Sequence, residues 1–204
     1  MIDKLLTFFM SLASVVLGGV LTQISANKNE KKLLLREKQR ICRENLGDTY
    51  ELIIEYNSKF MNFAPKDLLA NLDYIGEEDL SIEEVKSTLS ILFRKAAREG
   101  EASIAKSKLI ESKLKVLKTM QGSFDKYYFP LYNIYLEDKK FAIYASDDVK
   151  SSLKNFINLI IDGYEIGCTG FECKNNKTGK DINLFDDARD RLIHAMKVDL
   201  GIVN

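Results

Sequence analysis

The lone histidine of this chain, His194, is the residue best suited to proton transfer, and it follows an arginine at a short, fixed distance. Residues 189–194 read RDRLIH, so four residues separate Arg189 from His194, and Asp190 directly follows the arginine. An imidazole can exchange a proton near neutral pH, and a guanidinium can stabilise developing negative charge. Arg189, Asp190 and His194 are therefore the candidate catalytic residues.

The spacing of this motif leaves a second interpretation open. Residues five apart lie about 140° around an ideal helix and do not converge. Arg189 and His194 would meet only at an irregular helix start or across two subunits. The alternative is structural: Arg189 pairs with Asp186 or another nearby acid, and His194 is a packed or surface side chain.

The Arg-x4-His motif resembles that of the HEPN superfamily, helical bundles that include many RNA-cleaving toxins and CRISPR-associated nucleases. The resemblance implies that Arg189 and His194 cooperate on a scissile phosphate, with two motifs brought together by dimerisation. It leaves open whether the motif is active or degenerate, and RNA is a possible partner.

The N-terminal segment is the clearest structural signal in the sequence. Residues 5–24 read LLTFFMSLASVVLGGVLTQI, without a charge. Twenty helical residues at about 1.5 Å each span a hydrocarbon core of about 30 Å. A cleaved signal peptide would have a shorter apolar region and a small residue three positions before the cut. We therefore predict a transmembrane helix over residues 1–26.

The hydroxyl groups of this segment are confined to one side of the predicted helix. The polar and small residues of this stripe are spaced four, three, four, four and three apart, within an arc of about 80°. Lipid offers hydroxyls no partner, so the stripe should face protein or water. It predicts either helix–helix packing or a pore lining, and both require self-association or a partner. The stripe consists of Thr7, Ser11, Ser14, Gly18, Thr22 and Ser25.

A basic cluster follows the membrane segment and orients it. Its seven cations face only three acids, Glu30, Glu37 and Glu44, and such clusters stay in the cytoplasm. We expect a single-pass protein of the bacterial inner membrane, with its N-terminus outside and residues 27–204 inside. This basic collar could also contact anionic headgroups or lie at a pore mouth. It consists of Lys28, Lys31, Lys32, Arg36, Lys38, Arg40 and Arg43.

The remainder predicts an all-α domain. Two prolines and no tryptophan in 204 residues, with 30 basic and 30 acidic side chains, indicate helices and give no hint of a nucleic-acid partner. The periodicity predicts continuation of the first helix toward Pro65, then a short helix in residues 64–79 and helices over 81–100, 101–120, 124–144 and 146–165. An irregular stretch at 163–179, with a possible hairpin, precedes a last helix from Asp186 to Gly201. Pro130 should kink its helix or start a new turn.

Metal and cofactor chemistry has little support in the sequence. Cys168 and Cys173 lie five apart, but zinc would need two more good ligands and the chain has one histidine. Cys42 stands alone in a helical pattern. We interpret the three cysteines as reduced thiols and expect no metal and no cofactor.

The whole architecture resembles one specific family: the small membrane-anchored HEPN-like accessory proteins of type VI-B CRISPR systems. The resemblance rests on the N-terminal anchor, the helical domain and residues Arg189, Asp190 and His194. It implies a homo-oligomeric, pore-like assembly that perturbs the inner membrane downstream of an RNA-guided RNase. Two alternatives remain, a membrane-tethered HEPN ribonuclease and a membrane-anchored scaffold.

Overall fold

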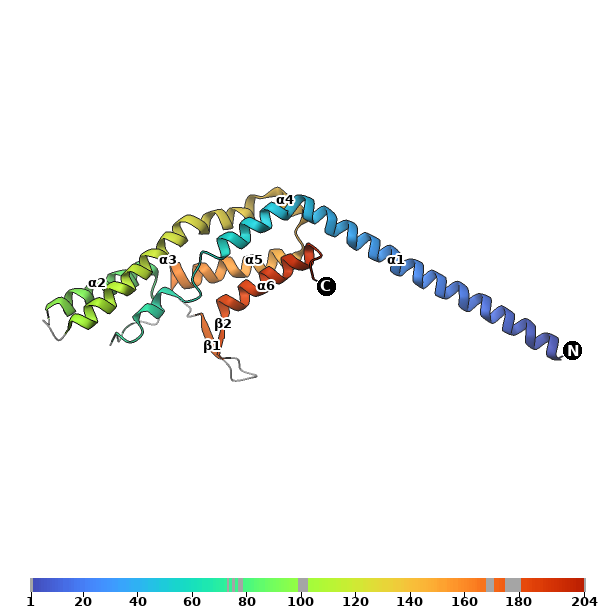
Figure 1. Cartoon of the computed structure of the whole chain (residues 1–204), viewed down its shortest axis with the longest axis horizontal. Helices are drawn as coiled ribbons and strands as arrows, with labels where there is room; N and C mark the ends of the chain where they lie inside the picture. Colours follow the sequence, from blue (N-terminus) through green and yellow to red (C-terminus); the bar gives the residue numbers. More distant parts are fainter. Residues whose placement is uncertain are drawn as a thin grey trace.

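The computed structural model is all-α apart from one short hairpin (Figure 1). It describes residues 2–72, 74, 76, 79–98, 103–167, 171–174 and 181–203, without the side chains of residues 2–22, 24, 172–174 and 181. The predicted fold class is therefore confirmed as all-α. The finer assignments, a membrane helix and a HEPN-like bundle, stay predictions.

The first helix, α1 (Ile2–Asn57), is 56 residues long, about 84 Å at 1.5 Å per residue. Its N-terminal part projects away from the bundle as an isolated rod (Figure 1). Its C-terminal part enters the core, because Cys42, Leu46, Tyr50 and Ile53 recur at helical spacing and all are buried. The boundary predicted at residue 26 thus falls inside one continuous helix.

In the part of the chain whose side chains are described, no helix combines the length and the apolar character needed to cross a membrane. Residues 5–22 of the predicted membrane helix lie outside that part. The transmembrane assignment therefore gains no support here and stays a prediction.

A helical hairpin forms the end of the molecule opposite to the N-terminus (Figure 1). It follows η1 (Pro65–Leu69), a short 3-10 helix, and consists of α2 (Ile82–Arg98) and the first half of α3 (Ile104–Glu137). The start of α2 is a capping box: Ser81 N donates to Glu84 Oε2 at 2.7 Å, and Glu84 N donates to Ser81 Oγ at 3.4 Å.

The helix α3 runs through Pro130, where the sequence suggested a kink or a new turn. Separate helices over 101–120 and 124–144 were predicted; α3 merges most of both and ends at Glu137. Asp138 accepts a hydrogen bond from Phe141 N at 3.0 Å and so caps α4 (Lys139–Tyr144). Burial of Tyr128 and Leu131 on either side of Pro130 holds this part of α3 against the core.

The last third of the chain forms two helices that pack on each other, and the second of them also contacts α1. Ser146 caps α5 (Asp147–Ile160), and a π-helical turn, η3 (Ile161–Ile166), follows. The hairpin predicted as possible is present, with β1 (Glu172–Lys174) antiparallel to β2 (Asp181–Asn183). Figure 1 shows α6 (Leu184–Asp199) beside α5. After α6, Gly201 adopts φ +67, the left-handed conformation that ends a helix.

Candidate functional site

The N-terminus of α6 is fixed to the segment that follows α1. Asn183 is the N-cap of the helix, because its Oδ1 accepts from Phe185 N and Asp186 N at 3.0 Å each. Its Nδ2 donates to Asn62 O at 2.7 Å, and Asn62 Nδ2 donates to Asp186 Oδ2 at 3.0 Å. These contacts place Arg189, which lies about one turn further along α6, against the end of α1.

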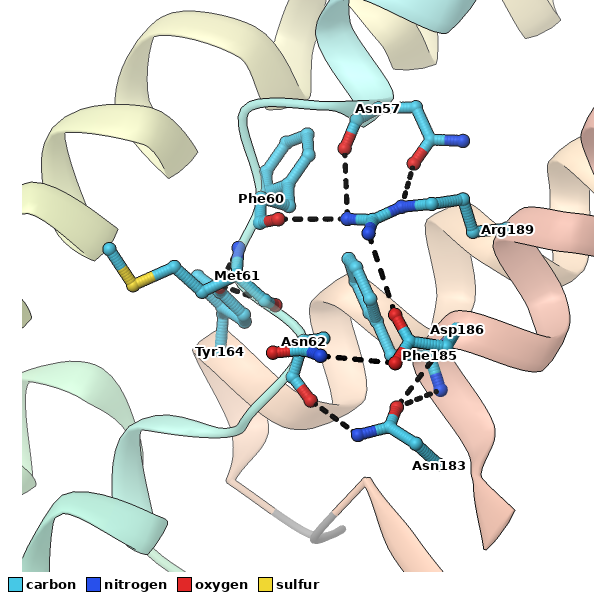
Figure 2. Close-up of polar contacts among 9 residues, drawn as sticks. All are labelled: Asn57, Phe60, Met61, Asn62, Tyr164, Asn183, Phe185, Asp186 and Arg189. Carbon is cyan, nitrogen blue, oxygen red and sulfur yellow. Dashed lines mark hydrogen bonds and ion pairs between the residues drawn. The ribbon is translucent and has the colours of Figure 1, made fainter.

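Arg189 holds the C-terminal end of α1 (Figure 2). Its Nε donates to Asn57 Oδ1 at 2.8 Å, and its Nη2 donates to Phe60 O at 2.9 Å and to Asn57 O at 3.3 Å. Nη1 lies 3.5 Å from Asp186 Oδ1, and the guanidinium carbon lies 4.8 Å from the centre of the Phe185 ring. We call this arrangement of Arg189 with Asn57, Phe60, Phe185 and Asp186 the Arg189 clasp.

The electrostatics of the clasp follow from the geometry of helix ends. The last carbonyl groups of a helix lack partners within the helix and carry partial negative charge, so a cation there is stabilising. A guanidinium offers several donors in one plane and can serve two carbonyls and an amide at once. Asn57 is only 1% exposed, and its Nδ2 has no partner among the described residues. Its Oδ1 therefore depends on Arg189.

Stacked aromatic side chains pack against Phe185 of the clasp. The ring of Phe185 stacks on Phe171 with centroids 4.9 Å apart, and Tyr164 stacks on Phe171 at 6.3 Å. The Tyr164 hydroxyl donates to Met61 O at 3.2 Å and accepts from Met61 N at 3.1 Å. Burial raises the pKa of Tyr164, so this hydroxyl stays protonated.

His194 has surroundings different from those of Arg189. It is exposed on α6 and lines a groove between α1, α5 and α6, together with Arg191 but without Arg189. Asp190 is exposed and lines none of the described grooves. Within one chain, the structure therefore does not bring the three motif residues together. Arg189 makes the predicted alternative contact, the pair with Asp186, and His194 is a surface side chain.

A second contact ties the other end of α6 to α1. The Tyr50 hydroxyl donates to Asp199 Oδ2 at 2.8 Å, and Ser146 N donates to the same oxygen at 2.9 Å. Cys42 Sγ lies 3.9 Å from the Tyr50 hydroxyl. Burial, and then the negative charge of Asp199, raise the pKa of both Tyr50 and the Cys42 thiol. Cys42 is thus a buried, protonated thiol rather than a nucleophile.

No family model, curated protein or solved structure matches this chain. The candidate site therefore stands on its own geometry. Among the described residues, no group of three or more His, Cys, Asp and Glu side chains could hold a metal ion. Cys168 and the side chain of Cys173 lie outside the described residues.

The remaining predicted site residues belong to α1. Of the polar stripe, the side chains of Thr7, Ser11, Ser14, Gly18 and Thr22 lie outside the described part, and Ser25 is exposed. All seven collar cations are exposed. Arg40 is partly neutralised, since it lies 2.6 Å from Glu37 and 2.9 Å from Glu44, and Lys38 lines the groove beside His194.

Sequence reasoning missed the partners of Arg189 and the role of Asp199. One signal was present: Asn57 is a polar residue within the otherwise apolar stripe that Leu46, Tyr50, Ile53 and Phe60 form. A polar side chain in such a stripe needs a buried partner. The carbonyl of Phe60 leaves no trace in the sequence, because every residue carries one.

Proposed function

We propose that this chain is a single-pass membrane effector in antiphage defence. Residues 5–24 cross the inner membrane, the bundle lies on the cytoplasmic side, and several copies assemble into a pore-like structure. The protein acts by perturbing the membrane, without catalysis by its own residues. The HEPN-like character of the bundle and the link to an RNA-guided CRISPR RNase belong to this proposal through the resemblance of the anchor and motif alone.

One observation favours an effector over a flexible tether: α1 is a single helix from Ile2 to Asn57. Its uncharged stretch, residues 5–24, and its buried C-terminal part belong to one unbroken helix, and the buried part is bound at two points by α6. A continuous helix transmits rotation and tilt along its length, whereas a loop after residue 26 would absorb them. A rearrangement of the bundle would therefore move the membrane segment.

The polar stripe and the basic collar take defined places in this proposal. The residues of the polar stripe, among them Thr7, Ser14 and Gly18, would line the pore or form the contacts between neighbouring helices. The collar would lie at the cytoplasmic mouth, where its cations also meet anionic headgroups.

The ribonuclease alternative is less favoured by the geometry. The guanidinium of Arg189 is engaged by two backbone carbonyls, an amide oxygen and a carboxylate within its own chain. A phosphate would have to displace these contacts, at the expense of the end of α1. We therefore assign Arg189 to structure and do not assign catalysis to His194.

The membrane insertion is tested first. Val16→Arg places a charge near the middle of residues 5–24, which costs about 2.5–3.5 kcal/mol in an inserted helix. We expect the unmodified chain to resist extraction of cell membranes by alkaline carbonate and the variant to be released. Extraction of the unmodified chain with soluble proteins would refute the anchor.

The pore is tested in cells that express the chain with an RNA-guided RNase and its target. We expect Ser14→Leu and Gly18→Leu to abolish depolarisation, measured with a potential-sensitive dye. Ala13→Leu and Gly19→Leu are matched controls, since each makes the same or a similar change one position away, about 100° around the helix from the residue it controls and outside the stripe. Full depolarisation by both stripe variants, or equal loss in the controls, would argue against a pore formed by this stripe.

A further inference from the structure

A groove of about 810 Å³ lies where α1 leaves the bundle, between α1, α5 and α6. This volume is within the range of small-molecule sites, about 300–1,000 Å³. A second hollow of about 330 Å³ shares Ser152, Asn155 and Arg191 with it and extends it along α5 and α6. The groove is separate from the Arg189 clasp, none of whose residues line it.

Polar side chains from three helices converge on the groove without partners of their own. None of these six side chains makes a hydrogen bond or ion pair with the described residues; Gln39 and Ser152 are half-buried, and the others are exposed. A Lys ammonium donates three hydrogen bonds, and hydroxyl, amide and imidazole groups donate and accept. The set therefore offers several hydrogen-bond donors to a ligand that carries acceptor atoms. It consists of Lys38, Gln39, Ser151, Ser152, Asn155 and His194.

The charged side chains around the groove differ in whether they already have partners within the protein. Asp199 already accepts from Tyr50 and from Ser146 N, so its oxygen Oδ2 is occupied. Arg191 pairs with Asp187 at 2.8 Å, but its side chain is 74% exposed and can turn into the groove. Asp148 lies in the first turn of α5, where the helix dipole stabilises its charge. The groove thus carries two carboxylates, which keep their charges, and two cations, Lys38 and Arg191, which an anionic group would engage.

The rest of the lining is apolar. Leu35, Ala195, Val198 and Val203 contribute carbon surface next to the donors. A ligand that fits both parts carries an anionic group rich in acceptor oxygens and a flat or apolar body. A phosphate on a nucleoside has this combination, since phosphate binds Lys, Arg and hydroxyl donors and a base covers apolar side chains.

We propose that this groove binds a nucleotide through its phosphate group. Lys38, Arg191 and His194 face the phosphate oxygens, Ser151, Ser152 and Asn155 bind the polar edge of the sugar or base, and Leu35 and Val198 contact its faces. A bound nucleotide bridges α1 to α5 and α6 at the point where α1 leaves the bundle. The site does not depend on the membrane proposal.

The test is isothermal titration calorimetry on the full chain in detergent micelles. The probes are purine and pyrimidine mononucleotides, cyclic dinucleotides, the corresponding nucleosides and inorganic phosphate. We expect saturable binding of at least one nucleotide and none of its nucleoside. Lys38→Glu should weaken that binding by about tenfold or more, since a charged hydrogen bond is lost and a repulsion added.

Two further variants keep the result interpretable. Ser152→Trp fills the shared part of both hollows and should abolish binding, while helical content stays unchanged by circular dichroism. Lys154→Glu makes the same charge change as Lys38→Glu on an exposed residue of α5 that does not line the groove, and it should bind normally. If inorganic phosphate bound as tightly as the nucleotide, the groove would be a site for free phosphate and the nucleotide proposal would be wrong. Equal binding of the nucleoside, no binding of any phosphate compound, or binding that Lys38→Glu leaves intact would overturn the proposal.

Discussion

Replacement of Arg189 by methionine should destabilise the bundle strongly, because the clasp holds buried groups that have no other partner. The variant keeps an unbranched side chain over Phe185 but loses the donors at 2.8 Å and 2.9 Å to Asn57 Oδ1 and Phe60 O. Hydrogen bonds from a charged donor contribute about 1.5–3 kcal/mol each, and they do not add fully. The pair with Asp186 adds little, since that carboxylate is 43% exposed.

The loss of stability should exceed that of two surface hydrogen bonds, because Asn57 is buried. Its side chain is 1% exposed and its Nδ2 already lacks a partner among the described residues, so the variant would leave Oδ1 unpaired as well. We expect the free energy of unfolding to fall by about 2–4 kcal/mol. For a chain of this size a loss of 3 kcal/mol corresponds to a Tm lower by about 6–12 °C.

The assay is thermal and urea unfolding of the full chain in detergent, followed by circular dichroism at 222 nm (a wavelength set by the helical backbone). Arg191→Met is the matched control, since Arg191 lies two residues further on α6, is 74% exposed and, among the described residues, pairs only with Asp187. We expect its effect to stay below about 0.5 kcal/mol. Equal stability of Arg189→Met and the unmodified chain, or equal losses in the two variants, would refute the structural role of Arg189.

Three further predictions concern the same packing. Gly201→Ala should lower the free energy of unfolding by about 1 kcal/mol, measured by urea unfolding, because φ is +67, a backbone conformation that is strained for a residue with a Cβ. Asn183→Ala should cost about 1–2 kcal/mol in the same assay, since it removes the N-cap of α6 and the contact to Asn62. The contribution of Tyr50 and Tyr164 to stability should be constant below pH 10 and fall as the pH rises above about 10, because burial raises the pKa of both above that of a tyrosine in the unfolded chain. Unfolding curves against pH should show this fall reduced in Tyr50→Phe; a fall of unchanged size would exclude Tyr50 as its source.

The helices could largely be predicted from sequence because their signals are local. Ser81, Ser146 and Gly201 begin or end helices in the structure as their residue types suggest. The errors lie where packing overrides a local preference. Pro130 removes one hydrogen bond from α3, but burial of Tyr128 and Leu131 keeps the helix continuous. The last helix begins at Leu184, two residues before the predicted start, because Asn183 rather than the acids forms its cap.

The site was harder to predict because a motif names residue types and not their partners. Arginine with histidine five residues later is compatible with phosphate chemistry, yet the guanidinium fork that suits two phosphate oxygens equally suits two carbonyl oxygens at a helix end. Which of the two it meets depends on residues 57 and 60, more than 120 positions earlier. Arg189 and His194, about 140° apart on α6, face the end of α1 and the groove respectively.

The two contacts that α6 makes with α1 bear on how the bundle could move the proposed membrane segment. Arg189 holds α1 at Asn57, and Asp199 holds it at Tyr50, seven residues and about 10 Å earlier. Two fixed points on one helix determine both its position and its direction, whereas a single contact would allow it to pivot. Ile53, between them, is fully buried, so the segment cannot rotate without exposing apolar surface. A signal that shifts α6 as a unit would therefore turn the whole of α1. A signal that releases Asp199 alone would let α1 swing about Asn57, with the largest displacement at its far, N-terminal end.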